Sequence, residues 1–160
     1  MKVGVVGLGT MGAGIAQLCV EAGLPTVGRE VTPQLGQKAR GQIEHFLTRK
    51  VEKGQLEESA RDEALLQLVT TTELADLAAC DVVIEAIVEE LGPKQALFAE
   101  LDRICRPDAV LATNTSALSV TEIAAASAHP ERVVGMHFFN PAPLMPLVEI
   151  VRAERTEDAP

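Results

Sequence analysis

The sequence predicts an α/β domain built on a doubly wound, mostly parallel sheet. Short apolar runs that suit buried strands alternate with segments of helical periodicity along the whole 160-residue chain. A glycine-rich turn follows the first apolar run and opens the first helical segment. Polar side chains follow several of the expected strands, at the edge where parallel sheets bind their ligands.

The first three elements form one strand–helix–strand unit. Residues 2–6 are a continuous apolar run with β-branched side chains, which indicates a buried parallel strand. Residues 11–22 carry apolar side chains at helical spacing, and Gly23 is placed to end that helix. The second strand is expected over 26–30, although Gly28 in its interior weakens it.

A helical hairpin is expected after the second strand. Thr32 followed by Pro33 is a helix-start signal, helical spacing continues to Val51, and Gly54 ends the helix. A second, antiparallel helix is expected over 57–68. The basic residues near one end of the hairpin are Arg49, Lys50 and Lys53. They are compatible both with a solvated face and with contacts to a phosphate.

The remaining chain alternates between strands and helices. Strands are expected at 69–72, 81–86, 109–112, 133–139 and 147–151. Helices are expected at 72–77, from Pro93 through Ile104, and at 120–126. The proline-rich turn at 140–143 reverses the chain, so the last two strands are predicted to be antiparallel neighbours. The fold class is therefore a doubly wound sheet with a hairpin insertion and an antiparallel last strand.

Composition limits the partners that we expect. The net charge is −9 with no basic run, and the few aromatic residues are all phenylalanine, which argues against nucleic acid binding. No apolar run approaches a membrane span and no targeting signal precedes the first strand, so we expect a cytoplasmic protein without membrane contact. The three scattered cysteines, Cys19, Cys80 and Cys105, indicate reduced buried thiols, and we expect no metal site.

The glycine-rich turn has the spacing of a Rossmann-type dinucleotide site. It reads Gly7, Leu8, Gly9, Thr10, Met11, Gly12. The first glycine suits a tight turn, the second lets the backbone approach a pyrophosphate, and the third lets helix and strand pack closely. Glu30 lies 23 residues after Gly7, where a ribose-binding carboxylate is expected. We therefore favour dinucleotide binding over a glycine turn without a ligand.

Two polar residues near the end of the chain suggest proton transfer. His137 lies near the end of one expected strand, and Glu149 lies twelve residues later on the next. If these strands pair antiparallel, the two side chains meet in a largely apolar site. The carboxylate then orients the imidazole and makes it a competent base. The alternative is a structural histidine in the core whose hydrogen-bonding requirement is met by a glutamate.

Ser116 follows Asn114 and Thr115 at another strand end. Such residues also cap turns. No nucleophile elbow surrounds Ser116, so a nucleophilic role is not expected. A hydroxyl that hydrogen-bonds a substrate oxygen or the nicotinamide half of a cofactor is the better functional interpretation.

Taken together, these stretches resemble the N-terminal, NAD-binding domain of the L-3-hydroxyacyl-CoA dehydrogenases, especially bacterial members of the 3-hydroxybutyryl-CoA and 3-hydroxyadipyl-CoA type. The resemblance covers essentially the whole chain. It rests on residues 7–16, 83–89, 114–119, on the specific His137-Phe-Phe-Asn-Pro141 segment, and on 147–149.

The resemblance implies oxidation of an (S)-3-hydroxyacyl-CoA by NAD to give a 3-oxoacyl-CoA and NADH. By match to the family, His137 takes the hydroxyl proton, Glu149 holds His137, and Ser116 bonds the reacting oxygen or the nicotinamide ribose. The expected cofactor-binding set is Gly7, Leu8, Gly9, Thr10, Met11, Gly12, Glu30, Glu89, Lys94, Asn114, Ser116 and Asn140. The expected CoA contacts are Lys53 and Ser116.

The chain departs from the family pattern at several positions. Glu30 replaces the usual aspartate, but either carboxylate repels a 2′-phosphate, and Arg29 is expected on the other face of the strand. Phe46 stands where a polar CoA contact can occur, which weakens that contact, and Ala117 replaces a second serine.

The family also carries a second, all-helical domain that supplies much of a dimer interface and a wall of the acyl pocket. We expect residues 1–155 to form the NAD-binding domain and 156–160 to begin the linker. We therefore weigh a hydroxyacyl-CoA dehydrogenase domain, weakly active or inactive in isolation and part of a possible homodimer, against two alternatives. These are a non-catalytic NAD-binding module that needs a partner domain and a related sugar-acid dehydrogenase.

Overall fold

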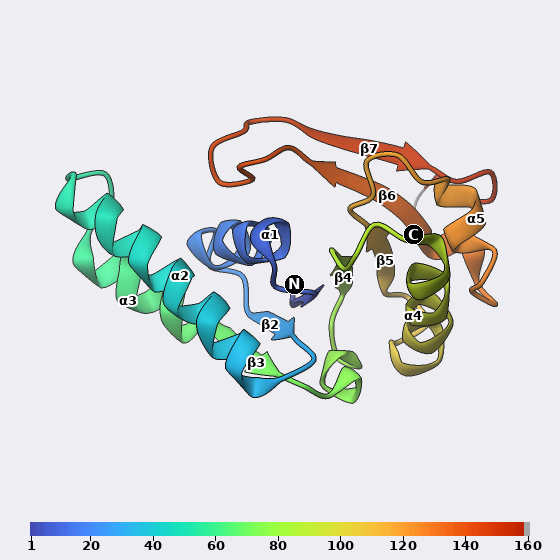
Figure 1. Cartoon of the computed structure of the whole chain (residues 1–160), viewed down its shortest axis with the longest axis horizontal. Helices are drawn as coiled ribbons and strands as arrows, with labels where there is room; N and C mark the ends of the chain where they lie inside the picture. The colour runs from blue at the N-terminus through green and yellow to red at the C-terminus, as the bar shows by residue number, and fades with distance from the viewer. Residues whose placement is uncertain (159–160) are drawn as a thin grey trace.

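A seven-stranded sheet in the order β3-β2-β1-β4-β5-β6-β7 forms the centre of the structure, a computed structural model that describes residues 1–158 (Figure 1). The strands are β1 (Val3–Val6), β2 (Thr26–Arg29), β3 (Leu68–Thr71), β4 (Val82–Glu85), β5 (Val110–Thr113), β6 (Val133–Phe138) and β7 (Val148–Arg152). The first six run parallel, and β7 pairs antiparallel with β6. The predicted fold class is confirmed.

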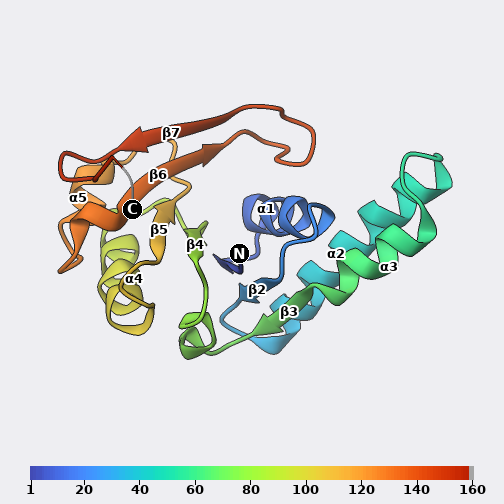
Figure 2. The ribbon, with the colours of Figure 1, turned by 180° about the vertical axis from the view of Figure 1, so that it is seen from behind.

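Helices cover both faces of this sheet (Figures 1 and 2). On one side lie α1 (Thr10–Glu21), α2 (Pro33–Glu52) and α3 (Glu58–Leu66), and on the other lie α4 (Leu91–Ile104) and α5 (Val120–Ala124). Two short 3₁₀ turns complete the fold, η1 (Leu74–Leu77) and η2 (Pro130–Arg132). None of the helices within residues 1–158 is long and apolar enough to cross a membrane.

Strand register distributes the core between the two faces. Val27, Val83 and Leu111 lie in one row across the sheet and pack with α4 and α5. The next row, which includes Ile84 and Ala112, packs with α1 and α2. Fully burying one such aliphatic side chain contributes roughly 1.5–3 kcal/mol. Both faces of the central strands β1, β4 and β5 are covered, so these strands are mostly apolar instead of alternating.

The helical hairpin of α2 and α3 forms as predicted. The Thr32 hydroxyl accepts a hydrogen bond of 3.3 Å from the Leu35 N–H and so caps α2. Gly54, just after α2, has a φ of +68°, a conformation that suits glycine. The Arg40 guanidinium donates to the Leu65 and Leu68 carbonyls at 3.0 and 2.6 Å, which ties α2 to the end of α3 and to β3.

Two helix predictions need correction. The segment expected as a helix at 72–77 forms only the 3₁₀ turn η1, because it is a short connection between β3 and β4. Helix α4 begins at Leu91, two residues before Pro93. Proline is tolerated there because the first N–H groups of a helix have no intrahelical partner.

The end of the described chain returns to the sheet. The Thr156 hydroxyl donates to the Val133 carbonyl at 2.6 Å, and the Glu157 N–H donates to the Glu131 carbonyl at 2.9 Å. Residues 156–158, where the linker was expected to begin, therefore lie against the start of β6. Residues 159–160 of that predicted linker lie outside the described residues.

Candidate cofactor and active site

The glycine loop between β1 and α1 has the geometry that a pyrophosphate requires. Gly7 has a φ of +85°, and a Cβ there would lie 2.8 Å from the Ala86 carbonyl oxygen. A Cβ on Gly12 would lie 1.7 Å from the Gly7 carbonyl oxygen, so only glycine lets α1 pack this close to the turn. A Cβ on Gly9 would meet nothing within 4 Å. The loop is therefore tightly packed at Gly7 and Gly12 and open to solvent at Gly9, where the N-terminus of α1 offers N–H groups to an anion.

Glu30 lies directly beside this loop. Its carboxylate accepts hydrogen bonds from the Leu8 N–H at 2.7 Å and from the Val31 N–H at 3.0 Å. Arg29 turns away and donates to the Thr72 carbonyl at 3.0 Å. A fixed carboxylate without a neighbouring cation suits a ribose diol and repels a 2′-phosphate. The residues present thus fit NAD.

His137 and Glu149 face each other across the β6–β7 pair. They are register partners, and His137 Nδ1 lies 2.9 Å from Glu149 Oε2. The ring centroids of His137 and Phe139 are 4.6 Å apart, so the imidazole is also held by packing. The predicted antiparallel pairing is confirmed. Since a carboxylate accepts the Nδ1 proton, Nε2 is left as the nitrogen that can accept another.

The surroundings of this pair are more open than predicted. The Glu149 side chain is 52% exposed and that of His137 is 19% exposed. All five residues of β7 are exposed, because β7 is the edge strand of the sheet. The apolar contact seen at the pair is Phe139, while the exposed edge strand leaves the Glu149 side open to solvent.

A cavity of about 340 Å³ lies beside His137. It brings together seven of the predicted site residues, namely Met11, Glu89, Lys94, Asn114, Ser116, His137 and Asn140. Met11 belongs to the glycine loop, so the cavity connects that loop with the histidine. Asn114 Oδ1 accepts a hydrogen bond of 2.9 Å from the Phe138 N–H, which joins the ends of β5 and β6 at the cavity wall.

A buried network of charged groups lies behind the same cavity. The Lys94 ammonium is only 1% exposed and contacts both Glu85 and, at 3.3 Å, Glu89 Oε2. Lys94 therefore reaches the cavity wall with its charge already paired, and a direct contact with the cofactor stays a prediction. Glu89 Oε1 in turn accepts hydrogen bonds from the Thr115 hydroxyl and from the Ser116 N–H, the latter at 3.1 Å.

Glu89 is held in its charged form. Desolvation acts to raise the pKa of the Glu89 carboxyl. The Thr115 hydrogen bond, the Lys94 charge and the Ser116 N–H outweigh it, so the pKa lies below its ordinary value. A carboxylate is thus present at the cavity at neutral pH.

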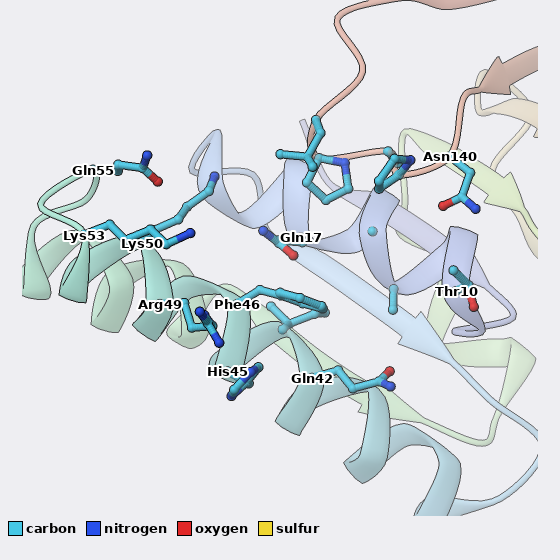
Figure 3. Close-up of a pocket in the computed structure, with 17 residues that line it drawn as sticks. Thr10, Gln17, Gln42, His45, Phe46, Arg49, Lys50, Lys53, Gln55 and Asn140 are labelled. Atoms are coloured by element: carbon cyan, nitrogen blue, oxygen red, sulfur yellow. The ribbon is translucent and has the colours of Figure 1, made fainter.

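A second cavity of about 590 Å³ lies between α1, α2 and the turn after β6 (Figure 3). One face of α2 contributes Phe46, Arg49 and Lys50 to it, and Lys53 follows directly after the helix. Lys50 also lies 2.5 Å from Glu21 of α1. Asn140 lines both cavities, so they meet at the end of β6. Lys53 therefore lies in a different cavity from Ser116, with which it was grouped as a CoA contact.

Three further residues belong to this region, although none of them was predicted to have a catalytic or binding role. They are Glu85, Thr113 and Thr115, which link the ends of β4 and β5 behind the cavity. One signal was present in the sequence, because β4 and β5 each end on a polar residue after three apolar ones. The register that pairs Glu85 with Thr113 was not readable from spacing.

The cysteines are all free among the described residues, as expected. Cys80 and Cys105 are buried, whereas Cys19 is only half-buried. Burial raises the pKa of the Cys19 and Cys105 thiols to about 11, so both are protonated and unreactive at neutral pH.

Comparison with known proteins agrees with this geometry. Residues 2–160 match the family described as "3-hydroxyacyl-CoA dehydrogenase, NAD binding domain". A 3-hydroxybutyryl-CoA dehydrogenase of Mycobacterium tuberculosis is 47% identical over 99% of this chain and 56% of its own length. A 3-hydroxyadipyl-CoA dehydrogenase of Escherichia coli K12 is 44% identical over 93% of this chain and 31% of its own.

Solved structures give the same result. The crystal structure of M. tuberculosis FadB2 superimposes with a TM-score of 0.96 at 47% identity, covering 98% of this chain and 55% of the other. The chain thus spans about half the length of the relatives that it matches. The open glycine loop and the Glu30 carboxylate beside it agree with these matches, and the chain belongs to the family of NAD-binding domains of 3-hydroxyacyl-CoA dehydrogenases.

Proposed function

We propose that this domain serves the NAD-dependent oxidation of (S)-3-hydroxyacyl-CoA to 3-oxoacyl-CoA. The observation that carries the proposal is the His137–Glu149 pair, 2.9 Å apart, at the wall of a cavity that also contains Met11 of the glycine loop. A base beside the nicotinamide end of an NAD site is what removal of a hydroxyl proton requires.

The proton transfer follows from the tautomer. Glu149 accepts the Nδ1 proton of His137, so Nε2 takes the hydroxyl proton of the substrate while carbon 3 becomes a carbonyl carbon. The glycine loop and Glu30 would hold NAD, which would supply the acceptor for the hydride that leaves carbon 3. The positive charge that develops on the imidazole is balanced by Glu149. General base catalysis of this kind is typically worth about 10²–10⁴-fold in rate.

The CoA portion of the substrate is assigned to the larger cavity. Arg49 and Lys53 give the wall at the end of α2 a positive charge beside the Lys50–Glu21 pair, although the whole chain carries −9. A phosphate group is attracted to such a local cluster. Ser116 lines the smaller cavity, which supports the assignment of its hydroxyl to the reacting oxygen or the nicotinamide ribose.

A second candidate follows from the exposure of β7. With Glu149 half exposed, water competes with substrate for the histidine, and the domain by itself could bind NAD without turnover. In this case residues 1–155 act as an NAD-binding module, and a helical domain beyond it covers the site and supplies the contacts of a homodimer.

The decisive experiment follows NADH oxidation with acetoacetyl-CoA by the wild type and by His137→Gln. We expect turnover by the wild type and a fall of about 10²-fold or more in His137→Gln with NADH binding retained. NADH binding without turnover by the wild type supports the module instead, and equal turnover by both proteins contradicts the mechanism.

A matched control is available in the same chain. His129 also pairs through Nδ1 with a carboxylate, Asp102, at 3.2 Å, but it lies outside both cavities. We expect His129→Gln to leave turnover unchanged. For the CoA cavity, Lys53→Ala is expected to raise the KM for acetoacetyl-CoA about tenfold, whereas Lys38→Ala, exposed on α2 and outside the cavity, leaves it unchanged.

A further inference from the structure

The buried carboxylate of Glu85 contacts both chain segments that flank the smaller cavity. Oε1 accepts a hydrogen bond of 2.7 Å from the Ile87 N–H, in the connection between β4 and α4. Oε2 accepts one of 2.7 Å from the Thr113 hydroxyl, at the end of β5. Ile87 itself lines the cavity, whereas Glu85 is completely buried behind it.

One connected route leads from Glu85 to the backbone of Ser116, and a second leads to the backbone of Thr115 beside it. In the first, Glu85 pairs with Lys94, Lys94 contacts Glu89 Oε2 at 3.3 Å, and Glu89 Oε1 accepts the Ser116 N–H at 3.1 Å. In the second, Thr113 connects Glu85 to the Thr115 N–H at 3.3 Å. One carboxylate therefore fixes the loop that carries Ser116 through both a charged and a neutral route.

Stability alone does not account for a buried ion pair at this position. Replacing such a pair by apolar side chains of similar volume is often neutral or stabilising, because two charges must be removed from water to form it. Among residues 1–158 no buried side-chain nitrogen or oxygen is left without a hydrogen-bond partner, so this network is fully satisfied. A complete polar network specifies one arrangement of its members, which a purely apolar core does less strictly.

We propose that Glu85 is a positioning residue for the nicotinamide half of the cofactor. It holds the Ser116 loop through Lys94 and Glu89, and it holds the connection after β4 through the Ile87 N–H. The adenosine half depends on other groups, the glycine loop and Glu30, which lie outside this network. The inference rests on the proposed placing of the nicotinamide beside His137.

This division predicts a selective effect on binding. Glu85→Gln keeps the shape of the side chain but removes its negative charge. The Lys94 ammonium then lacks the charge of Glu85, and the network holds the Ser116 loop less firmly. We expect the affinity for NADH to fall about tenfold, and the affinity for ADP, which lacks the nicotinamide and its ribose, to change by less than about twofold. Calorimetric titration of the folded domain with each ligand measures both values.

Thr113 provides a conservative rescue. Thr113→Val removes the hydroxyl that bonds Glu85 and keeps the volume, so we expect NADH affinity to fall about threefold with ADP affinity unchanged. Thr113→Ser keeps the hydroxyl and restores the affinity for NADH. A purely steric role for Thr113 predicts the opposite order, with valine tolerated and serine not.

The control is a buried carboxylate at the other end of the sheet. Asp102 also pairs with a buried arginine, Arg132, but it lies outside both cavities. Asp102→Asn is expected to lower the melting temperature and to leave the ratio of NADH to ADP affinity unchanged. If Asp102→Asn alters that ratio as much as Glu85→Gln does, the effect is a general loss of rigidity and the proposal is overturned.

Two further outcomes overturn the proposal. One is a parallel loss of NADH and ADP affinity in Glu85→Gln, and the other is unchanged NADH affinity. If Glu85→Gln does not fold, the neutral pair Glu85→Gln/Lys94→Met removes both charges and is measured in the same way with the same expectation. Because the readout is binding, absence of turnover in the wild type contradicts the proposed catalysis without affecting this test.

Discussion

Two buried ion pairs lie at opposite ends of the same sheet. Glu85 and Lys94 lie at the carboxyl end, with side chains 0% and 1% exposed, and Asp102 and Arg132 lie at the amino end, 4% and 6% exposed. The chemistry is alike, but the further contacts differ. Arg132 also donates to the carbonyls of Asp102 and Arg106, at 2.7 and 2.5 Å, so its pair fastens the last turn of α4 to the start of β6.

The carboxyl-end pair instead continues toward a cavity. Lys94 contacts Glu89, and Glu89 holds the Ser116 loop. The two histidine–carboxylate pairs repeat this contrast, because His137–Glu149 lies at a cavity and His129–Asp102 does not. The position in a parallel sheet, more than the residue types, decides whether a charged pair stabilises the fold or shapes a site.

The largest expected effect tests this contrast by removing the cation of each pair. Lys94→Met and Arg132→Met each leave a buried carboxylate without its partner, so we expect each to lower the free energy of unfolding by about 3–5 kcal/mol. Urea denaturation followed by circular dichroism measures this loss. NADH titration under native conditions should then distinguish the two variants, because only Lys94→Met is expected to lose affinity for NADH. Equal losses of affinity would contradict the difference between the two ends of the sheet.

Two glycine variants in the loop after β1 are expected to separate loss of NADH binding from loss of stability. A Cβ on Gly9 meets no protein atom within 4 Å, so the expected cost of Gly9→Ala is only that of a poorer N-cap for α1, about 1 kcal/mol in the free energy of unfolding. The same Cβ occupies the space that a pyrophosphate needs, so NADH affinity should fall at least about tenfold. Gly12→Ala is the matched opposite, because its Cβ would lie 1.7 Å from the Gly7 carbonyl oxygen and should destabilise the fold itself.

The pH dependence of stability is expected to show a smaller effect than these substitutions. Burial acts to raise the pKa of the Asp102 carboxyl, but hydrogen bonds from Arg132, Ser127 and His129 outweigh it, so this pKa is lowered in the folded state. Because the pKa is lowered, the charged Asp102 stabilises the fold at a pH above the pKa of aspartate in the unfolded chain, which is about 4. This stability is lost as the pH falls through the lower pKa of the folded state.

Denaturation midpoints measured between about pH 6 and pH 3 should therefore fall less steeply in Asp102→Asn than in the wild type. Glu89→Gln should flatten the curve less, because Glu89 is 42% exposed and solvent screens its interactions. Identical slopes for the wild type and Asp102→Asn are the result that contradicts this assignment.

The smallest effect is expected for an ion pair near the surface. Glu21 and Lys50 join α1 to α2 at 2.5 Å, with side chains 16% and 30% exposed. Such pairs are typically worth about 0–1 kcal/mol, so Glu21→Gln should change the midpoint of urea unfolding little. If Glu21→Gln lowers the free energy of unfolding as much as Arg132→Met does, then solvent exposure does not explain the different strengths of the two ion pairs.

Local patterns predicted most of the fold. The alternation of apolar strands and helices, the Thr32 cap and the glycine at 54 each act over a few residues, so spacing was enough to place them. The His137–Glu149 pairing was also predictable, because a short proline-rich reversal leaves two neighbouring strands only one simple arrangement. The helix expected at 72–77 failed because the connection between β3 and β4 is too short to offset the cost of nucleating an α-helix, so it forms a single 3₁₀ turn.

The sequence by itself determined the fold class, the dinucleotide loop and the histidine–glutamate pair, because periodicity, glycine spacing and turn chemistry are local properties. Only the tertiary structure decided how the strand ends meet. It joined Glu85 to Thr113 through strand register and buried Lys94 between two carboxylates. It also left Glu149 half exposed on an edge strand. These features depend on which residues become neighbours across the sheet and on what covers them, and both follow from packing over distances that no local pattern records.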